Sequence, residues 1–333
     1  MTRCDKINLS KRCCYDIVDY SSNQLYSAVT IFPIAMTTSL YSIELPDDQL
    51  PMVQVFANAK KKELSNIDSR QVVDLFKVHG AILFRDFDFD LSAFAKFTDQ
   101  FCDSYIRNES PGRESLDDDG RIQTVNLGER HFPLHPELSR EPWQPDIAWF
   151  NCEQAATMQG ETTVCDGIAA AKAFSPSLFA HLKESTLAHT IPATLEWCTN
   201  YLGNPDLRID EVERYSTPAM QFKLKNGEIT RTYLRPMLHK PMFSDQWAYG
   251  NFLVFARKQL RVSYFPTYAN GEEIPDGIVD EIEQVTNGLA SDIKWQKGDL
   301  VMLDNTRFMH GRNPIGDPQN RRIYTQFGYA SFS

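Results

Sequence analysis

One stretch of the sequence, WQKGDLVMLDNTRFMHGR at residues 295–312, carries the strongest indication of the fold. The apolar run at residues 300–303 predicts a buried strand, which ends at an Asp-Asn pair. His310 follows shortly after this pair, and two arginines, Arg321 and Arg322, open a further strand-like run. A random sequence rarely supplies a buried strand, a polar turn, a histidine and a basic pair in this order, so the order indicates a functional site.

A second indication lies far upstream of this stretch. His135 and Glu137 are two positions apart, so on an extended segment both side chains point the same way and can hold one ion. Composition alone predicts about one such triplet in a chain with 7 histidines and 44 acidic residues, so the triplet gains weight only together with His310. His131 and Asp304 are the alternative ligands, although His131 has no partner carboxylate and Asp304 suits a turn that caps the strand.

The composition excludes several classes of protein. A chain of 333 residues with 42% hydrophobic and 23% charged residues is typical of a globular protein, not of a collagen-like, coiled-coil or disordered one. Its net charge of -10 disfavours nucleic acid as a partner. Residues 20–43 are uncharged but contain eight Ser or Thr residues, which is too polar for a membrane-spanning helix, and acidic residues precede them where a signal peptide would be basic. We therefore expect no membrane partner.

The cysteine pattern indicates the cellular compartment, and the absence of glycine-rich motifs disfavours one class of fold. The seven cysteines are scattered, odd in number and without a CxxC pair, which fits a reducing compartment. We therefore expect a cytoplasmic protein. Neither GxGxxG nor GxxxxGK[ST] occurs, so a nucleotide-binding parallel sheet is disfavoured.

Hydrophobic periodicity predicts a mixed α+β chain. Helical spacing follows Ser65 and ends at Gly80, and a second helix at residues 169–184 is interrupted by Pro176. Short strand-like runs occupy residues 81–87, 147–152, 162–165, 221–225, 230–234, 300–303 and 323–329. Short strands bounded by Gly, Pro and Asn favour a β-barrel or jelly roll with helical insertions over a doubly wound parallel sheet.

The same pattern suggests how the chain is organised. Residues 1–65 are expected to form an N-terminal extension packed on the core. Residues 66–333 are expected to form the main domain, with an insertion around residues 185–290. The polar stretch at residues 108–121 predicts a solvent-exposed loop, and a lid over the site is the alternative.

These motifs together resemble the taurine-dioxygenase and clavaminate-synthase-like group of iron(II)- and 2-oxoglutarate-dependent oxygenases. The resemblance begins with the strand GAILFR at residues 80–85 and includes His135-x-Glu137. Gly160-Glu161-Thr162 is similar to the family's Gly-Gly-[DE]-Thr, and the Trp-x-x-Gly-Asp segment, His310 and the arginine pair complete the match. The resemblance implies a double-stranded β-helix, the jelly roll of clavaminate synthase.

The resemblance also implies the site residues. His135, Glu137 and His310 would bind iron(II), because two imidazoles and one carboxylate on one face of an octahedron leave three positions open for oxygen chemistry. By resemblance, 2-oxoglutarate would take two of these positions and O2 another. An arginine and the hydroxyl of Thr162 would hold the distant carboxylate of 2-oxoglutarate.

The residue that follows each arginine suggests which of the two holds that carboxylate. The family usually has an aliphatic residue after this arginine, so Arg322, which precedes Ile323, is preferred over Arg321. Gln326 lies four residues after Arg322 and therefore on the same face of a strand. Sulfonate-oxidising relatives have an arginine at this position, which binds their anionic substrate. If Gln326 contacts the substrate, its neutral amide disfavours taurine, whose sulfonate needs a cation.

The segment around His310 resembles the branch of the family that acts on amino acids or on amino-acid units in natural-product pathways. We therefore expect hydroxylation or desaturation of an aliphatic carbon in an amino-acid-like small molecule, free or carrier-bound, with Arg312 as a second candidate substrate contact. Oxidative rearrangement, cyclisation or fragmentation at the same iron is one alternative. A catalytically silent metal-binding protein is another, and a homo-oligomer is compatible with the sequence.

Overall fold

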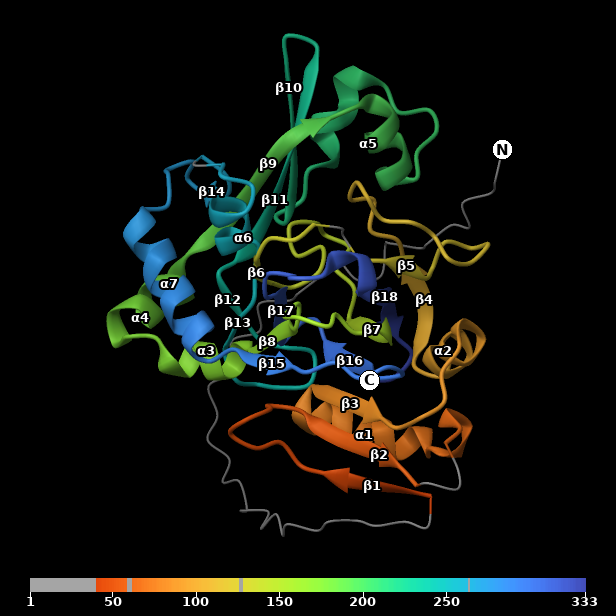
Figure 1. The fold of residues 1–333 in the computed structure, drawn as a ribbon. Helices are drawn as coiled ribbons and strands as arrows, with labels where there is room; N and C mark the ends of the chain where they lie inside the picture. Colours follow the sequence, from red (N-terminus) through yellow and green to blue (C-terminus); the bar gives the residue numbers. More distant parts are fainter. Residues whose placement is uncertain (1–39, 59–61, 126–127, 263) are drawn as a thin grey trace, which may run out of the picture.

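The computed structural model describes residues 40–333, except residues 59–61, 126–127 and 263. The described chain is a mixed α/β structure in which two β-sheets face each other and a third sheet projects from them (Figure 1). Most of the uncharged segment at residues 20–43 lies outside the described residues. Among the described helices, none has the length and apolar character needed to cross a membrane.

The larger sheet has eight strands and contains the predicted strand at residues 300–303 near its centre. Across the sheet the strands are β1 (Tyr41–Glu44), β2 (Val53–Ala57), β3 (Ala81–Arg85), β16 (Leu300–Asp304), β7 (Ile147–Gln154), β18 (Arg322–Ala330) and β4 (Cys102–Ile106), with β5 (Gln123–Thr124) also paired to β18. Neighbouring strands are antiparallel except for β2 and β3, which are parallel. The strands β1 and β2 thus extend this sheet from within the expected N-terminal extension.

The smaller sheet lies against the inner face of the larger one. Its strands, in order, are β15 (Ser291–Ile293), β8 (Thr162–Asp166), β17 (Phe308–Arg312) and β6 (Phe132–His135). Apolar side chains from both sheets share one core, including Phe150 and Phe327 from the larger sheet and Val164 and Phe308 from the smaller one. Strands buried on both faces explain why the sequence has continuous apolar runs here instead of an alternating pattern.

Helices cover the outer face of the larger sheet and one side of the smaller sheet (Figure 1). The α-helices in the described part of the chain are α1 (Ser69–His79), α2 (Leu91–Thr98), α3 (Gly167–Ala173), α4 (Pro176–Glu184), α5 (Leu195–Leu202), α6 (Leu253–Lys258) and α7 (Asp276–Gly288), of which α5 packs on the third sheet. The predicted interruption at Pro176 is confirmed, because Ser175 caps α4 and Pro176 is its first residue. Gly80 ends α1 with φ 74°, a conformation that favours glycine.

The third sheet forms an arm that projects from the two facing sheets (Figure 1). It consists of β10 (Met220–Lys225), β11 (Glu228–Pro236), β9 (Thr186–Ala193) and β14 (Thr267–Tyr268), while β12 (Leu238–His239) pairs with β13 (Ala248–Tyr249). Helix α5 packs on β10 and β11 through an apolar cluster that includes Cys198 and Phe222. The arm falls within the region where the sequence suggests an insertion.

Two arginines of β11 connect the arm to the segment that follows β6. Arg231 donates to both carboxylate oxygens of Glu141 at 2.7 and 3.0 Å, and both side chains are less than 10% exposed. The Arg231 guanidinium also lies 4.1 Å from the ring centre of Trp197. Arg235 donates to the backbone oxygen of Ser139 at 3.4 Å. The arm therefore fixes the chain immediately after Glu137.

We expect Arg231→Ala to lower the free energy of unfolding by about 3 kcal/mol, because the substitution leaves a buried carboxylate without its cation. Arg140, 3.7 Å from Glu141 and 40% exposed, can compensate only in part. Urea denaturation followed by tryptophan fluorescence measures the effect. Arg208→Ala removes the exposed ion pair with Asp210 and serves as the control, with no measurable change expected. An equal, small effect of both substitutions would contradict a structural role for the Arg231–Glu141 pair.

Candidate metal centre

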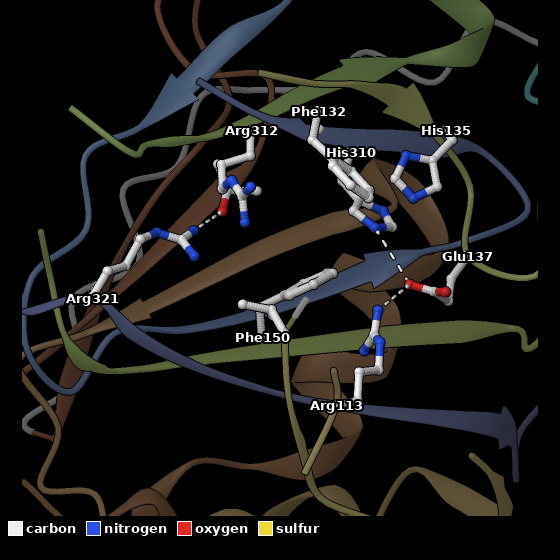
Figure 2. Close-up of a pocket in the computed structure, with 11 residues that line it drawn as sticks. Arg113, Phe132, His135, Glu137, Phe150, His310, Arg312 and Arg321 are labelled. Atoms are coloured by element: carbon white, nitrogen blue, oxygen red, sulfur yellow. Dashed lines mark hydrogen bonds and ion pairs between the residues drawn. The ribbon is translucent and has the colours of Figure 1, made fainter. Parts of the chain in front are cut away.

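Three side chains from two distant parts of the sequence meet between the sheets (Figure 2). Strands β6 and β17 pair so that His135 and His310 are register partners, with ring centres 4.7 Å apart. The Glu137 Oε2 atom lies 3.7 Å from the His310 Nε2 atom. One potential ligand atom from each residue lies within 4.8 Å of the others, and all three residues are buried. The structure thus brings the three predicted ligands together.

Close backbone approach makes this arrangement possible. A Cβ atom at Gly311 would lie 2.5 Å from the backbone oxygen of Phe132 and 2.7 Å from the Thr163 Oγ1 atom. Only glycine lets β17 approach β6 so closely beside His310.

Asn305, the second residue of the Asp-Asn pair, holds the backbone of Glu137. Its Oδ1 accepts from the Glu137 backbone N at 2.7 Å. Its Nδ2 donates to the backbone oxygens of Glu137 and Pro145 at 3.0 and 2.9 Å. No sequence pattern predicts this contact, because Asn305 is 168 residues from Glu137.

The alternative ligands lie elsewhere. Asp304 accepts hydrogen bonds from the backbone N and Oγ1 of Thr306 at 2.8 and 2.6 Å, so it caps the turn as the sequence indicates. Burial raises the pKa of Asp304 to about 6. His131 is exposed at the surface.

Burial and neighbouring charges fix the protonation of Glu137 and His135. Burial acts to raise the pKa of Glu137, but Arg113 and then His310 outweigh it and hold that pKa at about 2. Burial, followed by the neighbouring His310, lowers the pKa of His135 to about 3. Glu137 is therefore a carboxylate and His135 a neutral imidazole near neutral pH, the forms that bind a metal ion.

A hydrogen bond orients the first histidine for metal binding. The His135 Nδ1 atom donates to the backbone oxygen of Pro133 at 2.8 Å, which leaves Nε2 as the potential ligand atom. Two imidazoles and one carboxylate that converge beside an open pocket fit a divalent transition metal with free coordination positions better than a closed structural zinc site. The residues present therefore fit iron(II).

The pocket beside this group has an empty volume of about 440 Å³, part of it open to solvent. Its lining combines apolar and charged side chains from both sheets and from the segment before β6: Arg113, Val125, Phe132, His135, Glu137, Phe150, Thr162, His310, Gly311, Arg312 and Arg321. In Figure 2, Arg321 and the three potential metal ligands lie at opposite ends of the pocket.

Arg321 lies next to Thr162 in this pocket. Its Nη2 donates to the Thr162 Oγ1 atom at 3.3 Å, and its Nε donates to the backbone oxygen of Gly160 at 2.8 Å. Trp295 Nε1 also donates to the Thr162 Oγ1 atom, at 3.0 Å. Because this oxygen accepts two hydrogen bonds, its own proton is available to an anion. Burial and then Arg312 lower the pKa of Arg321 to about 10, so it stays a cation near neutral pH.

The preference for Arg322 over Arg321 is corrected by the structure. Arg322 is exposed, with Nε 3.0 Å from Glu153 Oε2 and Nη2 2.7 Å from Gln154 Oε1, outside the pocket. Ile323 lies in the core between the sheets, whereas Arg322 is exposed on the other side of a register shift in the β18–β7 ladder. An aliphatic residue after an arginine therefore does not place that arginine inside.

The expectation for Gln326 is also corrected by the structure. Gln326 does not line the pocket but contacts α2, which covers the outer face of the larger sheet. Gln326 is fully buried and accepts a hydrogen bond from the Thr98 Oγ1 atom of α2 at 2.7 Å. Gln326 therefore does not bear on whether taurine can bind in the pocket. Arg312 does line the pocket, and its Nη2 donates to the backbone oxygens of Gly128 and Arg130.

Two residues that contact Glu137 were missed in the sequence. Asn108 Nδ2 donates to the Glu137 Oε1 atom, and Arg113 Nη2 lies 3.4 Å from the Glu137 Oε2 atom. Both come from residues 108–121, which have neither helix nor strand, as predicted, but which contribute to the wall of the pocket. No periodic pattern marks a residue in such a segment, so only the structure could reveal them.

We expect Asn305→Ala to weaken metal binding about 10- to 100-fold, because it removes the two hydrogen bonds that hold the Glu137 backbone. Calorimetric titration with Zn(II), a redox-inactive ion that takes the same ligand types, measures the change. Asn270→Ala, at an exposed turn, is the control and should bind zinc like the unaltered chain. Unchanged zinc affinity in the Asn305 variant would contradict the role of this residue.

Comparison with known proteins places the chain in a family. Its residues 48–325 match the family described as taurine catabolism dioxygenase TauD, TfdA family. The chain is 22% identical over 318 residues to a clavaminate synthase-like protein of Arabidopsis thaliana, covering 86% of this chain and 91% of that protein. It is 25% identical over 216 residues to the dapdiamide synthesis protein DdaC of Enterobacter agglomerans, covering 57% of this chain and 63% of DdaC.

Solved structures agree on the fold. The PvcB protein from Pseudomonas aeruginosa superposes with a TM-score of 0.57 and 12% identity, over 88% of this chain and 93% of PvcB. PvcB is described as an Fe, alpha-ketoglutarate dependent oxygenase from an isonitrile synthetic pathway. With a family match that spans most of the sequence, the chain belongs to the TauD/TfdA family of iron(II)- and 2-oxoglutarate-dependent dioxygenases.

Proposed function

We propose that the chain hydroxylates or desaturates an aliphatic carbon of an amino-acid-like small molecule in natural-product biosynthesis. The observation that carries this proposal is the buried group of His135, Glu137 and His310 at one end of a pocket that has Arg321 at its other end. The pathways named for DdaC and PvcB support the substrate class. In this proposal the two facing sheets form the double-stranded β-helix that the sequence indicates.

Each group has a defined task in the proposal. His135, Glu137 and His310 hold iron(II), which supplies the oxidant that removes hydrogen from an unreactive C–H bond when 2-oxoglutarate and O2 are present. Arg321 and Thr162 bind the distant carboxylate of 2-oxoglutarate through charge-assisted hydrogen bonds. The apolar side chains of Phe132 and Phe150 exclude water from this region.

The buried cysteines agree with a reducing compartment. The described cysteines Cys102, Cys152, Cys165 and Cys198 are free and buried. Burial raises the pKa of Cys102, Cys152 and Cys165 to about 12, so these thiols are unreactive near neutral pH. We infer a cytoplasmic location.

Anaerobic addition of iron(II) and 2-oxoglutarate tests the proposal. We expect a visible metal-to-ligand charge-transfer absorption band, since a keto acid chelated to iron(II) produces one. Succinate should form when O2 and a substrate are then supplied. A protein that is loaded with iron but shows no band would contradict the proposal.

The same titration distinguishes the two neighbouring arginines. Arg321→Gln should raise the 2-oxoglutarate concentration needed for half of the band at least about tenfold, because a buried carboxylate loses its charged partner. Iron binding should be unchanged. Arg322→Gln is a matched control and should titrate like the unaltered chain, because Arg322 is exposed outside the pocket. The opposite result would return the role to Arg322.

A further inference from the structure

Arg113 lines the pocket but has no assigned task in the proposed function. Its side chain is 8% exposed and lies beside Glu137 at the metal end of the pocket (Figure 2). Its guanidinium packs over the ring of Phe327, 5.4 Å from the ring centre, so its position is fixed by an apolar contact as well as by charge. A buried guanidinium that faces a ligand pocket is a strong candidate for binding an anion.

Metal binding changes the surroundings of Arg113. The Glu137 Oε2 atom lies near both Arg113 Nη2, at 3.4 Å, and His310 Nε2, at 3.7 Å. When Glu137 shares its negative charge with a divalent ion, it neutralises Arg113 less. The cation then stands in a buried site next to another cation, which is unfavourable unless an anion approaches.

The charge balance of the whole pocket agrees with this view. A divalent ion and the 2-oxoglutarate dianion cancel each other. Three arginines and one carboxylate then remain among the described residues that line the pocket, which is an excess of two positive charges. Arg312 directs Nη2 to the backbone oxygens of Gly128 and Arg130, and Arg321 lies with Thr162 at the far end. Arg113 is thus the cation beside the metal ligands.

We propose that Arg113 binds a free carboxylate of the substrate, which gives the proposed function a more specific substrate class and rests on it. The planar guanidinium can hold this carboxylate with two parallel hydrogen bonds. The hydrocarbon part of the substrate then lies against Val125, Phe132 and Phe150. An amino acid tethered to a carrier through its carboxyl group has no such carboxylate, so the substrate is a free acid.

A binding experiment that requires no turnover tests this proposal. The full chain is loaded with Zn(II) and 2-oxoglutarate, and each proteinogenic L-amino acid is compared with its primary amide by ligand-observed NMR titration. We expect at least one amino acid to bind, and its amide to bind at least about tenfold more weakly because the amide lacks the charge that pairs with arginine.

Variants of Arg113 show whether this residue causes the preference. Arg113→Gln should weaken binding of that amino acid at least about tenfold and make the acid and amide bind equally. Arg113→Lys should keep part of the preference, because it keeps the charge but not the planar geometry. Arg107→Gln, half exposed in the strand-to-loop connection before Asn108, is the matched control and should behave like the unaltered chain.

The affinities for zinc and for 2-oxoglutarate distinguish substrate binding from two other roles that Arg113 could have. If Arg113 only positioned Glu137, Arg113→Gln would change zinc affinity and leave the acid-amide preference intact, which would overturn the proposal. A variant that loses affinity for 2-oxoglutarate but not for the amino acid would assign Arg113 to the cosubstrate and also overturn it.

Binding of 2-oxoglutarate tests the proposed function separately from the role of Arg113. Failure of 2-oxoglutarate to bind the zinc-loaded unaltered chain would contradict the proposed function, and the acid-amide comparison with zinc alone would still decide the role of Arg113. Equal binding of acids and amides to the unaltered chain, or binding of neither, would overturn the proposal for Arg113.

Discussion

The pairing of β6 with β17 is the constraint on which the rest of the site depends. It makes His135 and His310 cross-strand neighbours, and Gly311 allows the two backbones to approach closely enough. Glu137 lies just beyond the end of β6, so strand pairing alone cannot position it. Asn305 does so through two hydrogen bonds to the Glu137 backbone, and Gln144 in turn donates to the backbone oxygen of Asn305 at 2.7 Å. The site is therefore held by connected backbone contacts.

Electrostatics complements this geometry. A buried carboxylate beside two imidazoles would be protonated more readily without a nearby cation, and Arg113 supplies that cation. In the proposed function, the same arginine would carry excess positive charge once a metal ion is bound beside it. At the other end of the pocket, Arg321 is held by Gly160 and Thr162. The pocket thus has a cation at each end and apolar side chains between them.

The metal group could be predicted from the sequence because short motifs mark it: His135-x-Glu137 and, far downstream, a buried strand with a polar end followed by His310, in an order that resembles the family. The choice between Arg321 and Arg322 could not, because it depends on which face of β18 points inward, and the ladder between β18 and β7 shifts register at Arg322 and Ile323. The error for Gln326 followed from that choice. Arg113 could not be predicted, because it belongs to an irregular segment whose path no periodic pattern describes. The strands β1 and β2 were also missed, in a region expected to be only an extension.

The most direct test of the account is a crystal structure of the chain prepared anaerobically with iron(II) and 2-oxoglutarate. We expect one iron ion bound by His135, Glu137 and His310, with 2-oxoglutarate extending from it to Arg321. Iron bound elsewhere, or a Glu137 carboxylate turned away from the two imidazoles, would contradict it.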